Sequence, residues 1–164
     1  MSKAVLISIR PEWCEKIING QKTIEVRKTR PKMDTPFKCY IYRSVQGGVI
    51  GEFVCDDIFE RIVRVGATCE PPKYCICDWN MDCTPLDTLL ADACLTKDEL
   101  EKYLDGGVGY GWHISNLRIY DTPRELREFY AVPNEVEVAL KAKPKPITRP
   151  PQSWQYVEEE IWND

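Results

Sequence analysis

The sequence has no hydrophobic run that approaches the roughly 20 apolar residues of a membrane-spanning helix. Its first apolar stretch, Ala4–Ile9, is interrupted by Ser8 and followed directly by Arg10. This stretch is too short for the core of a secretory signal peptide, so we expect a cytoplasmic protein with no membrane partner. Internal repeats and a second domain are also lacking, and the 164 residues predict one domain that spans 1–164.

The sequence also lacks the paired C-x2-C motifs that form the tight turns of structural zinc sites. It has eight cysteines, and four of them lie close together in the pattern C-x5-C-x-C-x5-C: Cys69, Cys75, Cys77 and Cys83. Because thiols stay reduced in the cytoplasm, these four are either free thiols or the ligands of a zinc ion. No other cofactor is indicated.

A large charge of one sign is absent as well, since the net charge is −4. This value argues against strong, indiscriminate binding to nucleic acid. The charges are unevenly distributed, however: residues 1–45 hold ten basic and four acidic side chains, whereas residues 51–105 hold five basic and thirteen acidic ones. One positive face on an acidic protein would attract an anionic partner, although the charges can equally be those of an ordinary solvated surface.

Hydrophobic periodicity and turn residues predict an α+β domain, a small mixed β-barrel of five to six strands with short peripheral helices. The predicted helices begin at Pro11, Thr84 and Thr96, and Thr96-x-x-Glu99 forms a capping box. A helical turn is also expected from Thr122 to about Phe129. A Cys-containing loop of about 66–84 shows no periodicity, and a proline-rich tail covers about 142–164. The predicted strands are Lys3–Ile9, Lys22–Arg27, Phe37–Ser44, Val49 to about Val65 and Val108–Tyr120.

The second predicted strand alternates strictly, and its two faces differ. Glu25 and Arg27 share one face and are close enough to pair, while Ile24 and Val26 share the other. Lys22 falls on the apolar face by parity, and it joins the charged pair only if a twist or bulge at the start of the strand redirects it. Periodicity alone favours an exposed salt bridge on a barrel strand.

The stretch from Ile7 to Arg27 resembles the ASCH domain, whose signature is a first strand, a helix and then G-x-K-x-x-E-x-R. The matching residues here are Gly20, Lys22, Glu25 and Arg27. The segments GYGWHIS (109–115) and PPQSW (150–154) are similar to the closing strand and tail of phage and bacterial members. The resemblance implies the PUA-like fold, a small β-barrel otherwise met in RNA-modifying enzymes and in readers of modified bases.

The resemblance further implies a ligand cleft beside the motif. Arginine and lysine suit a phosphate or a carbonyl group, and a glutamate accepts from an exocyclic amine. The candidate stacking platforms are Trp13, Tyr110, Trp112 and Trp154, with core packing as the alternative for each tryptophan. The lone histidine shows no recognisable Asp or Ser partner. The expected ligand-binding residues are Arg10, Lys22, Glu25, Arg27, Trp112, His113 and Trp154.

Three functions remain open at this point. The favoured one is binding of RNA, of single-stranded nucleic acid or of a modified nucleoside, as a regulator of transcription or translation. The second is an enzyme with Lys22 as catalytic residue: an amidohydrolase that acts on N4-acetylcytidine-like nucleosides, or a ribonuclease. One bacterial branch of the ASCH family resembles such amidohydrolases. This chain has Glu25 and Ala93 at the positions where that branch has a catalytic threonine and glutamate, which counts against the activity. The third is a phage-type factor that binds a protein partner.

Overall fold

The computed structural model describes residues 2–65, 73–77, 83–84 and 86–162. Its contacts divide the chain into two compact units. Unit 1 comprises Met1–Cys14, Pro36–Val54 and Asn116–Asp164, and unit 2 comprises Glu15–Thr35 and Cys55–Ser115. Two long strands, β4 (Val49–Val65) and β7 (Gly109–Arg124), contribute residues to both units.

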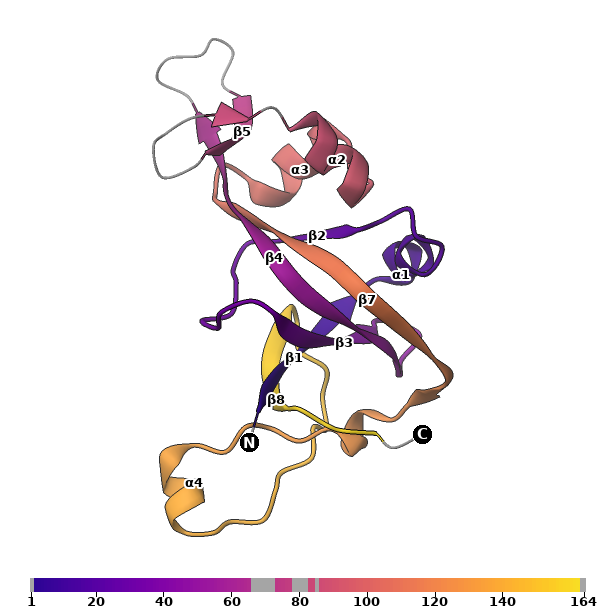
Figure 1. Cartoon of the computed structure of the whole chain (residues 1–164), viewed down its shortest axis with the longest axis vertical. Helices are drawn as coiled ribbons and strands as arrows, with labels where there is room; N and C mark the ends of the chain where they lie inside the picture. Colours follow the sequence, from indigo (N-terminus) through magenta and orange to yellow (C-terminus); the bar gives the residue numbers. More distant parts are fainter. Residues whose placement is uncertain (1, 66–72, 78–82, 85, 163–164) are drawn as a thin grey trace. The chain divides into compact units, whose positions relative to one another are not determined.

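Unit 1 is built on a sheet in which the strand order is β7-β4-β3-β1-β8 (Figure 1). The central strand β1 runs parallel to β3 and antiparallel to β8. Residues 4–7 are all buried, as expected for a continuous apolar run in the middle of a sheet. Besides its parts of β4 and β7, this unit contains β1 (Lys3–Ile9), β3 (Phe37–Arg43), a 3-10 turn (Leu126–Glu128), α4 (Glu135–Ala139) and β8 (Trp154–Glu158).

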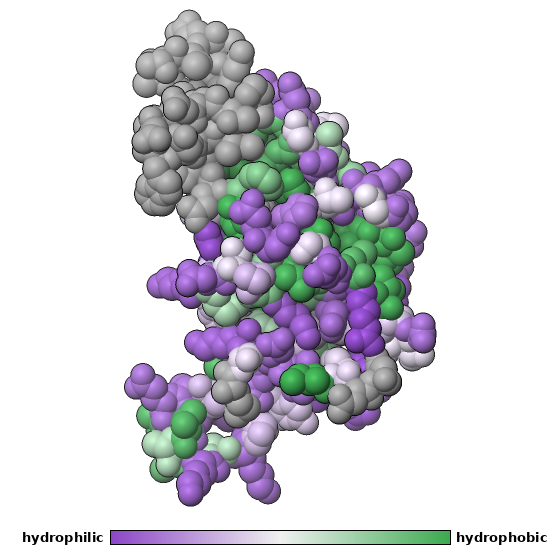
Figure 2. Space-filling model, in the orientation of Figure 1, coloured by the Kyte–Doolittle hydropathy of each residue, from purple (hydrophilic) through white to green (hydrophobic). Residues whose placement is uncertain are grey.

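The core of unit 1 lies where the aromatic ring of Tyr40 meets Phe129, with ring centroids 4.9 Å apart in an edge-to-face arrangement. Aliphatic side chains of β1, β4 and β8 complete it. By contrast, the segment around α4 exposes Val136, Val138 and Leu140. Figure 2 shows hydrophobic and hydrophilic residues side by side over α4.

In unit 2 the strand order is β2-β7-β4-β5-β6. Its short elements are β2 (Ile24–Arg27), β5 (Lys73–Cys77), β6 (Cys83–Thr84), α2 (Asp87–Ala93) and α3 (Lys97–Leu104). The remaining helix, α1 (Pro11–Ile18), begins in unit 1 and ends in unit 2.

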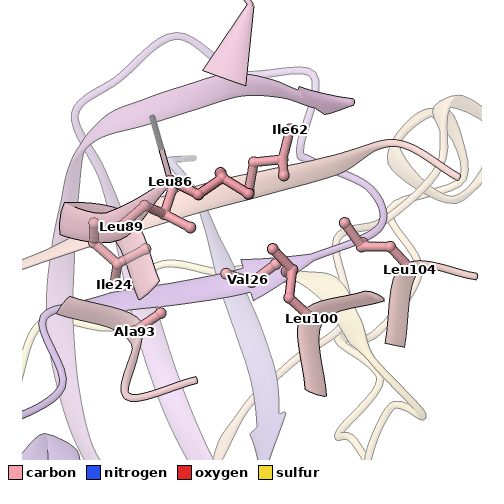
Figure 3. Close-up of a cluster of buried hydrophobic side chains, with 8 residues drawn as sticks. All are labelled: Ile24, Val26, Ile62, Leu86, Leu89, Ala93, Leu100 and Leu104. Carbon is pink, nitrogen blue, oxygen red and sulfur yellow. The ribbon is translucent and has the colours of Figure 1, made fainter. Parts of the chain in front are cut away.

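The core of unit 2 forms between the two helices α2 and α3 and one face of the sheet (Figure 3). Ile24 and Val26 of β2 and Ile62 of β4 point toward leucines of the helices. Gly111 permits this packing, because a Cβ atom there would lie 3.2 Å from both Ile24 and Leu89 side-chain atoms. The apolar face of β2 is therefore committed to the core, which leaves the other face to Glu25 and Arg27.

Several predicted elements occur where the sequence placed them. Gly20 ends α1 with a φ of +81°, and Thr96 and Glu99 form the predicted capping box of α3. The six strands β1–β4, β7 and β8 give the predicted number. Within the described residues no helix is long and apolar enough to cross a membrane.

Three segments differ in detail from the local patterns. The loop of about 66–84 contains the short strands β5 and β6, of which β5 pairs with the end of β4 and β6 pairs with β5. The helical turn expected from Thr122 begins later, because β7 continues to Arg124 and the 3-10 turn covers Leu126–Glu128. Within the proline-rich tail, Trp154–Glu158 forms β8 by pairing with β1.

Candidate functional site

The connection between α1 and β2 determines where the motif side chains lie. After the turn at Gly20, the backbone N–H of Lys22 donates to the carbonyl of Lys16 at 2.9 Å. The N–H of Thr23 donates to the carbonyl of Asp92 at 2.8 Å. These bonds keep Lys22 outside the strand, so the parity rule that assigned it to the apolar face of β2 does not apply to it.

Glu25 lies between two cations. Its Oε1 accepts a hydrogen bond from Arg27 Nε at 3.0 Å and also lies 3.0 Å from Arg27 Nη2. Its Oε2 lies 3.3 Å from Lys22 Nζ, which in turn donates to the carbonyl oxygen of Ala93 at 2.6 Å. We call these three side chains the Lys22–Glu25–Arg27 cluster. Two cations and one carboxylate give it a net charge of +1.

The cluster is buried rather than solvated. The side chains of Lys22, Glu25 and Arg27 are 2%, 9% and 10% exposed, which excludes the exposed salt bridge favoured by periodicity. In β7 the residues opposite Glu25 and Arg27 are Trp112 and Tyr110. Because opposed residues in antiparallel strands share a face, these aromatic side chains lie on the same face as the cluster.

A basic loop follows directly after Arg27. Residues 28–34 line a cavity of about 460 Å³ together with Tyr110. The loop carries Lys28, Arg30 and Lys32 against a single acid, Asp34. The guanidinium of Arg30 donates to the backbone carbonyls of Pro31 and Met33. This side chain therefore stabilises the conformation of the loop and also contributes to its positive charge.

Tyr103, which the sequence analysis did not single out, lies on α3 beside this loop. Lys28 Nζ is 5.0 Å from the centroid of its ring. Burial raises the pKa of Tyr103, and Arg27 opposes that rise. Its hydroxyl group is hydrogen-bonded to the backbone of Lys28. The sequence signal for this residue is faint: an exposed aromatic residue in a helix that is rich in charged residues.

Of the other predicted ligand residues, Trp112 lies on the face of the cluster, whereas Trp154 and Arg10 belong to unit 1. Trp112 is fully buried, so its ring presents no accessible face for stacking. Trp154 lies in β8 of unit 1, where its ring packs edge-to-face against Tyr156 at 5.3 Å. Arg10 is an exposed residue of unit 1, where its carbonyl oxygen accepts the first backbone bonds of α1.

His113 lies on the other face of the sheet, because it opposes Ile24 rather than Glu25. Its Nδ1 is 2.6 Å from Asp56 Oδ1, a partner from β4 that the sequence did not reveal. This bond, with a further one to Ser115, holds the pKa of Asp56 below its usual range. The pairing across strands is invisible to any local pattern, and the opposite face separates His113 from the Lys22–Glu25–Arg27 cluster.

The structure does not describe the side chains of the four predicted zinc ligands. Cys69 lies in an undescribed segment, and only the backbone is described for Cys75, Cys77 and Cys83. In the part of the chain that is described, no three His, Cys, Asp or Glu side chains gather in a way that could hold a metal ion.

Similarity to known proteins agrees with the motif and the fold described above. Residues 7–103 match the ASCH domain family. The fold is similar to that of an ASCH protein from Zymomonas mobilis, with a TM-score of 0.60 and 18% identity over 95% of this chain and 88% of that one. A tyrosine-to-phenylalanine variant of that protein gives a TM-score of 0.60 at 18% identity, covering 96% of this chain and 92% of that one.

The serine-to-alanine variant of the Zymomonas protein is similar to the same degree, with a TM-score of 0.60 and 17% identity over 95% of this chain and 89% of that one. No curated protein sequence matches the chain. At this identity the structures show the fold alone, which is the predicted PUA-like α+β fold. With more than half of its residues matched, the chain belongs to the ASCH domain family, which is associated with RNA binding.

Proposed function

We propose that this protein binds RNA, and that the contact is made by the basic loop 28–34 and Tyr110. The observation that carries the proposal is the cavity of about 460 Å³, which three cationic residues, one acid and one tyrosine line together. Arginine and lysine bind phosphate groups, and an aromatic face stacks on an unpaired base. The family's association with RNA binding supports the same partner.

In this proposal the Lys22–Glu25–Arg27 cluster acts mainly by positioning. Its side chains are at most 10% exposed, and none of them lines the cavity. The cluster holds the end of β2, from which the basic loop begins. Its net positive charge lies in a region of low dielectric, which adds to the attraction of the loop for phosphate.

The geometry does not favour an amidohydrolase. A lysine acts as nucleophile or base only through a free lone pair, which usually requires desolvation or a cationic neighbour. Lys22 Nζ instead lies 3.3 Å from the Glu25 carboxylate and donates to the Ala93 carbonyl oxygen, and its side chain is only 2% exposed to a substrate.

The test is a binding titration with a short, fluorescein-labelled single-stranded RNA, followed by anisotropy at several salt concentrations. The double variant Lys28→Gln/Lys32→Gln removes two loop cations without touching the cluster. A matched control, Lys97→Gln/Lys143→Gln, removes two exposed cations that do not line the cavity. Circular dichroism of each variant checks that it is folded.

We expect the loop variant to bind about tenfold more weakly and the slope of log K against log salt to fall by about 1.4, because each phosphate contact contributes about 0.7 for a single strand. The control should bind like the wild type. Equal affinity of the loop variant and the wild type would refute the assignment to the loop. Absence of any salt-dependent binding by the wild type would refute the function.

A further inference from the structure

A second concentration of basic and aromatic side chains lies in unit 1, on the distal part of β7. The sequence Arg118-x-Tyr120-x-Thr122-x-Arg124 alternates, so these four residues share one face of the strand. We call them the β7 stripe. All four line a cavity of about 650 Å³. Nothing in the ASCH motif includes these positions.

The stripe is organised around the ring of Tyr120. The guanidinium carbon of Arg118 lies 5.8 Å from the ring centroid and that of Arg124 lies 5.2 Å from it. Arg124 also lies 3.8 Å from the centroid of the Trp162 ring. These are cation–π distances, and they place two flat guanidinium groups and two aromatic rings in one cluster.

Neighbouring strands hold the stripe in place. The Tyr120 hydroxyl donates to Glu52 Oε2 at 2.6 Å, and Lys38 Nζ lies 3.7 Å from the other oxygen of Glu52. Burial and the Glu52 carboxylate both raise the pKa of Tyr120, so the phenol remains a hydrogen-bond donor at neutral pH. The ring is thereby fixed by its polar end.

Gly51 of β4 brings the backbones of β4 and β7 together at this point. A Cβ atom on Gly51 would lie only 2.5 Å from the carbonyl oxygen of Arg118, so no other residue fits without a backbone shift. The close approach sets the position of Arg118 at the start of the stripe. The stripe is therefore a preorganised surface rather than a set of independent surface residues.

The charges decide what kind of ligand suits the cavity. Arg118 and Arg124 are balanced there by Asp121 and Glu128, and Arg124 Nη1 lies 3.6 Å from Glu128 Oε1. A cavity with no net charge does not hold a free phosphate by electrostatic attraction alone. The stronger feature of the cavity is its flat guanidinium and aromatic groups, which can stack on a ligand. Every unpaired base offers a π-face to such groups, whatever the RNA sequence.

We propose that the β7 stripe is a second RNA-contact surface, which takes unpaired bases of a single strand by stacking on Tyr120 and on the arginine guanidinium groups. Bases within a duplex are already stacked on one another, so this surface selects single strands. The inference rests on the proposed function in one respect only, which is that the ligand is RNA. It does not depend on the basic loop being the other contact.

The first experiment is photochemical cross-linking of the full chain to a single-stranded RNA that contains 4-thiouridine, followed by peptide mapping. We expect adducts on two peptides, one with Tyr120 and one with Tyr110. Adducts on the Tyr110 peptide alone would overturn the present inference and leave the proposed function standing. Adducts on the Tyr120 peptide alone would support the stripe and refute the loop. No adduct on either peptide would refute both.

Binding titrations with substitutions then measure the contribution of the stripe. Tyr120→Leu should weaken binding of the single strand about tenfold and Arg118→Gln about threefold, because each variant loses a stacking group. Tyr120→Phe keeps the ring but loses the bond to Glu52 that fixes it, so its affinity should lie between those of the wild type and Tyr120→Leu. The matched control is Arg127→Gln, an exposed arginine that does not line the cavity.

The same titrations are run with a blunt duplex RNA. Equal loss of affinity for duplex and single strand in Tyr120→Leu would contradict stacking on unpaired bases. Unchanged affinity for both would overturn the inference, and would leave a protein partner as the remaining occupant of this cavity. Thermal unfolding of each variant separates a loss of contact from a loss of folded protein.

Discussion

Replacing Glu25 by glutamine tests the cluster that the ASCH motif builds. At an effective dielectric constant of about 20, the attractions of Glu25 to Arg27 and to Lys22 at the observed distances are each about 5 kcal/mol. Desolvation of three buried charges costs several kcal/mol per ion and offsets most of this gain. The net contribution of the intact cluster to stability is therefore small.

Removal of the Glu25 carboxylate alone lowers the stability much more than the small net contribution of the intact cluster suggests. The variant Glu25→Gln leaves two cations, each at most 10% exposed, without a counterion. Breaking a buried pair in this way costs about 3–5 kcal/mol, a large part of the stability of a domain of this size. We expect the midpoint of urea unfolding to fall accordingly, with an unchanged m-value if unfolding stays two-state.

The matched control for this prediction is Glu101→Gln on α3. Glu101 lies 3.9 Å from Lys97, and both side chains are well exposed, so the expected loss is about 0.5 kcal/mol or less. Urea unfolding of both variants is followed by far-ultraviolet circular dichroism. If Glu25→Gln and Glu101→Gln shift the unfolding free energy by the same amount, the reasoning about an uncompensated buried charge is refuted.

Three further predictions concern single residues. Val45 has a φ of +69° and is 95% exposed, so Val45→Asn should raise the unfolding free energy by about 0.5–1 kcal/mol; an unchanged or lower value would contradict strain at this turn. The hydrogen bond to His113 lowers the pKa of Asp56 in the folded state, so Asp56→Asn should lose a few tenths of a kcal/mol at pH 6, a difference that disappears as the pH falls below about 3.8. Burial raises the pKa of the Cys55 thiol to about 12, so timed alkylation at pH 8 with peptide mapping should modify it far more slowly than Cys94, which is half-buried.

Much of the fold could be predicted from local patterns. The apolar run of β1, the capping box at Thr96 and the left-handed turn at Gly20 each depend on a few neighbouring residues. Tyrosine 156 and its neighbours in β8 could not be predicted in this way. That strand follows a proline-rich segment in the sequence, and it forms because it pairs with β1 from the far end of the chain.

The candidate site shows the same limit. The pairing of Glu25 with Arg27 follows from strand parity alone. Its burial does not, because it depends on residues that are distant in sequence, such as Trp112 opposite Glu25 and Tyr103 near Arg27. The hydrogen bond between His113 and Asp56 likewise joins two strands far apart along the chain. Local patterns predict which residues share a face, but not what covers that face.

The spacing of the motif G-x-K-x-x-E-x-R has a physical explanation in this structure. Residues two apart in a strand share a face, which accounts for Glu25 and Arg27. Residues three apart in a strand lie on opposite faces, so Lys22 reaches Glu25 only because the strand begins after it, at Ile24. The turn at Gly20 and the bonds to α1 and α2 produce that late start. The motif's glycine therefore has a role of its own, because the turn at its positive φ comes before the bonds that hold Lys22 outside the strand and within reach of Glu25.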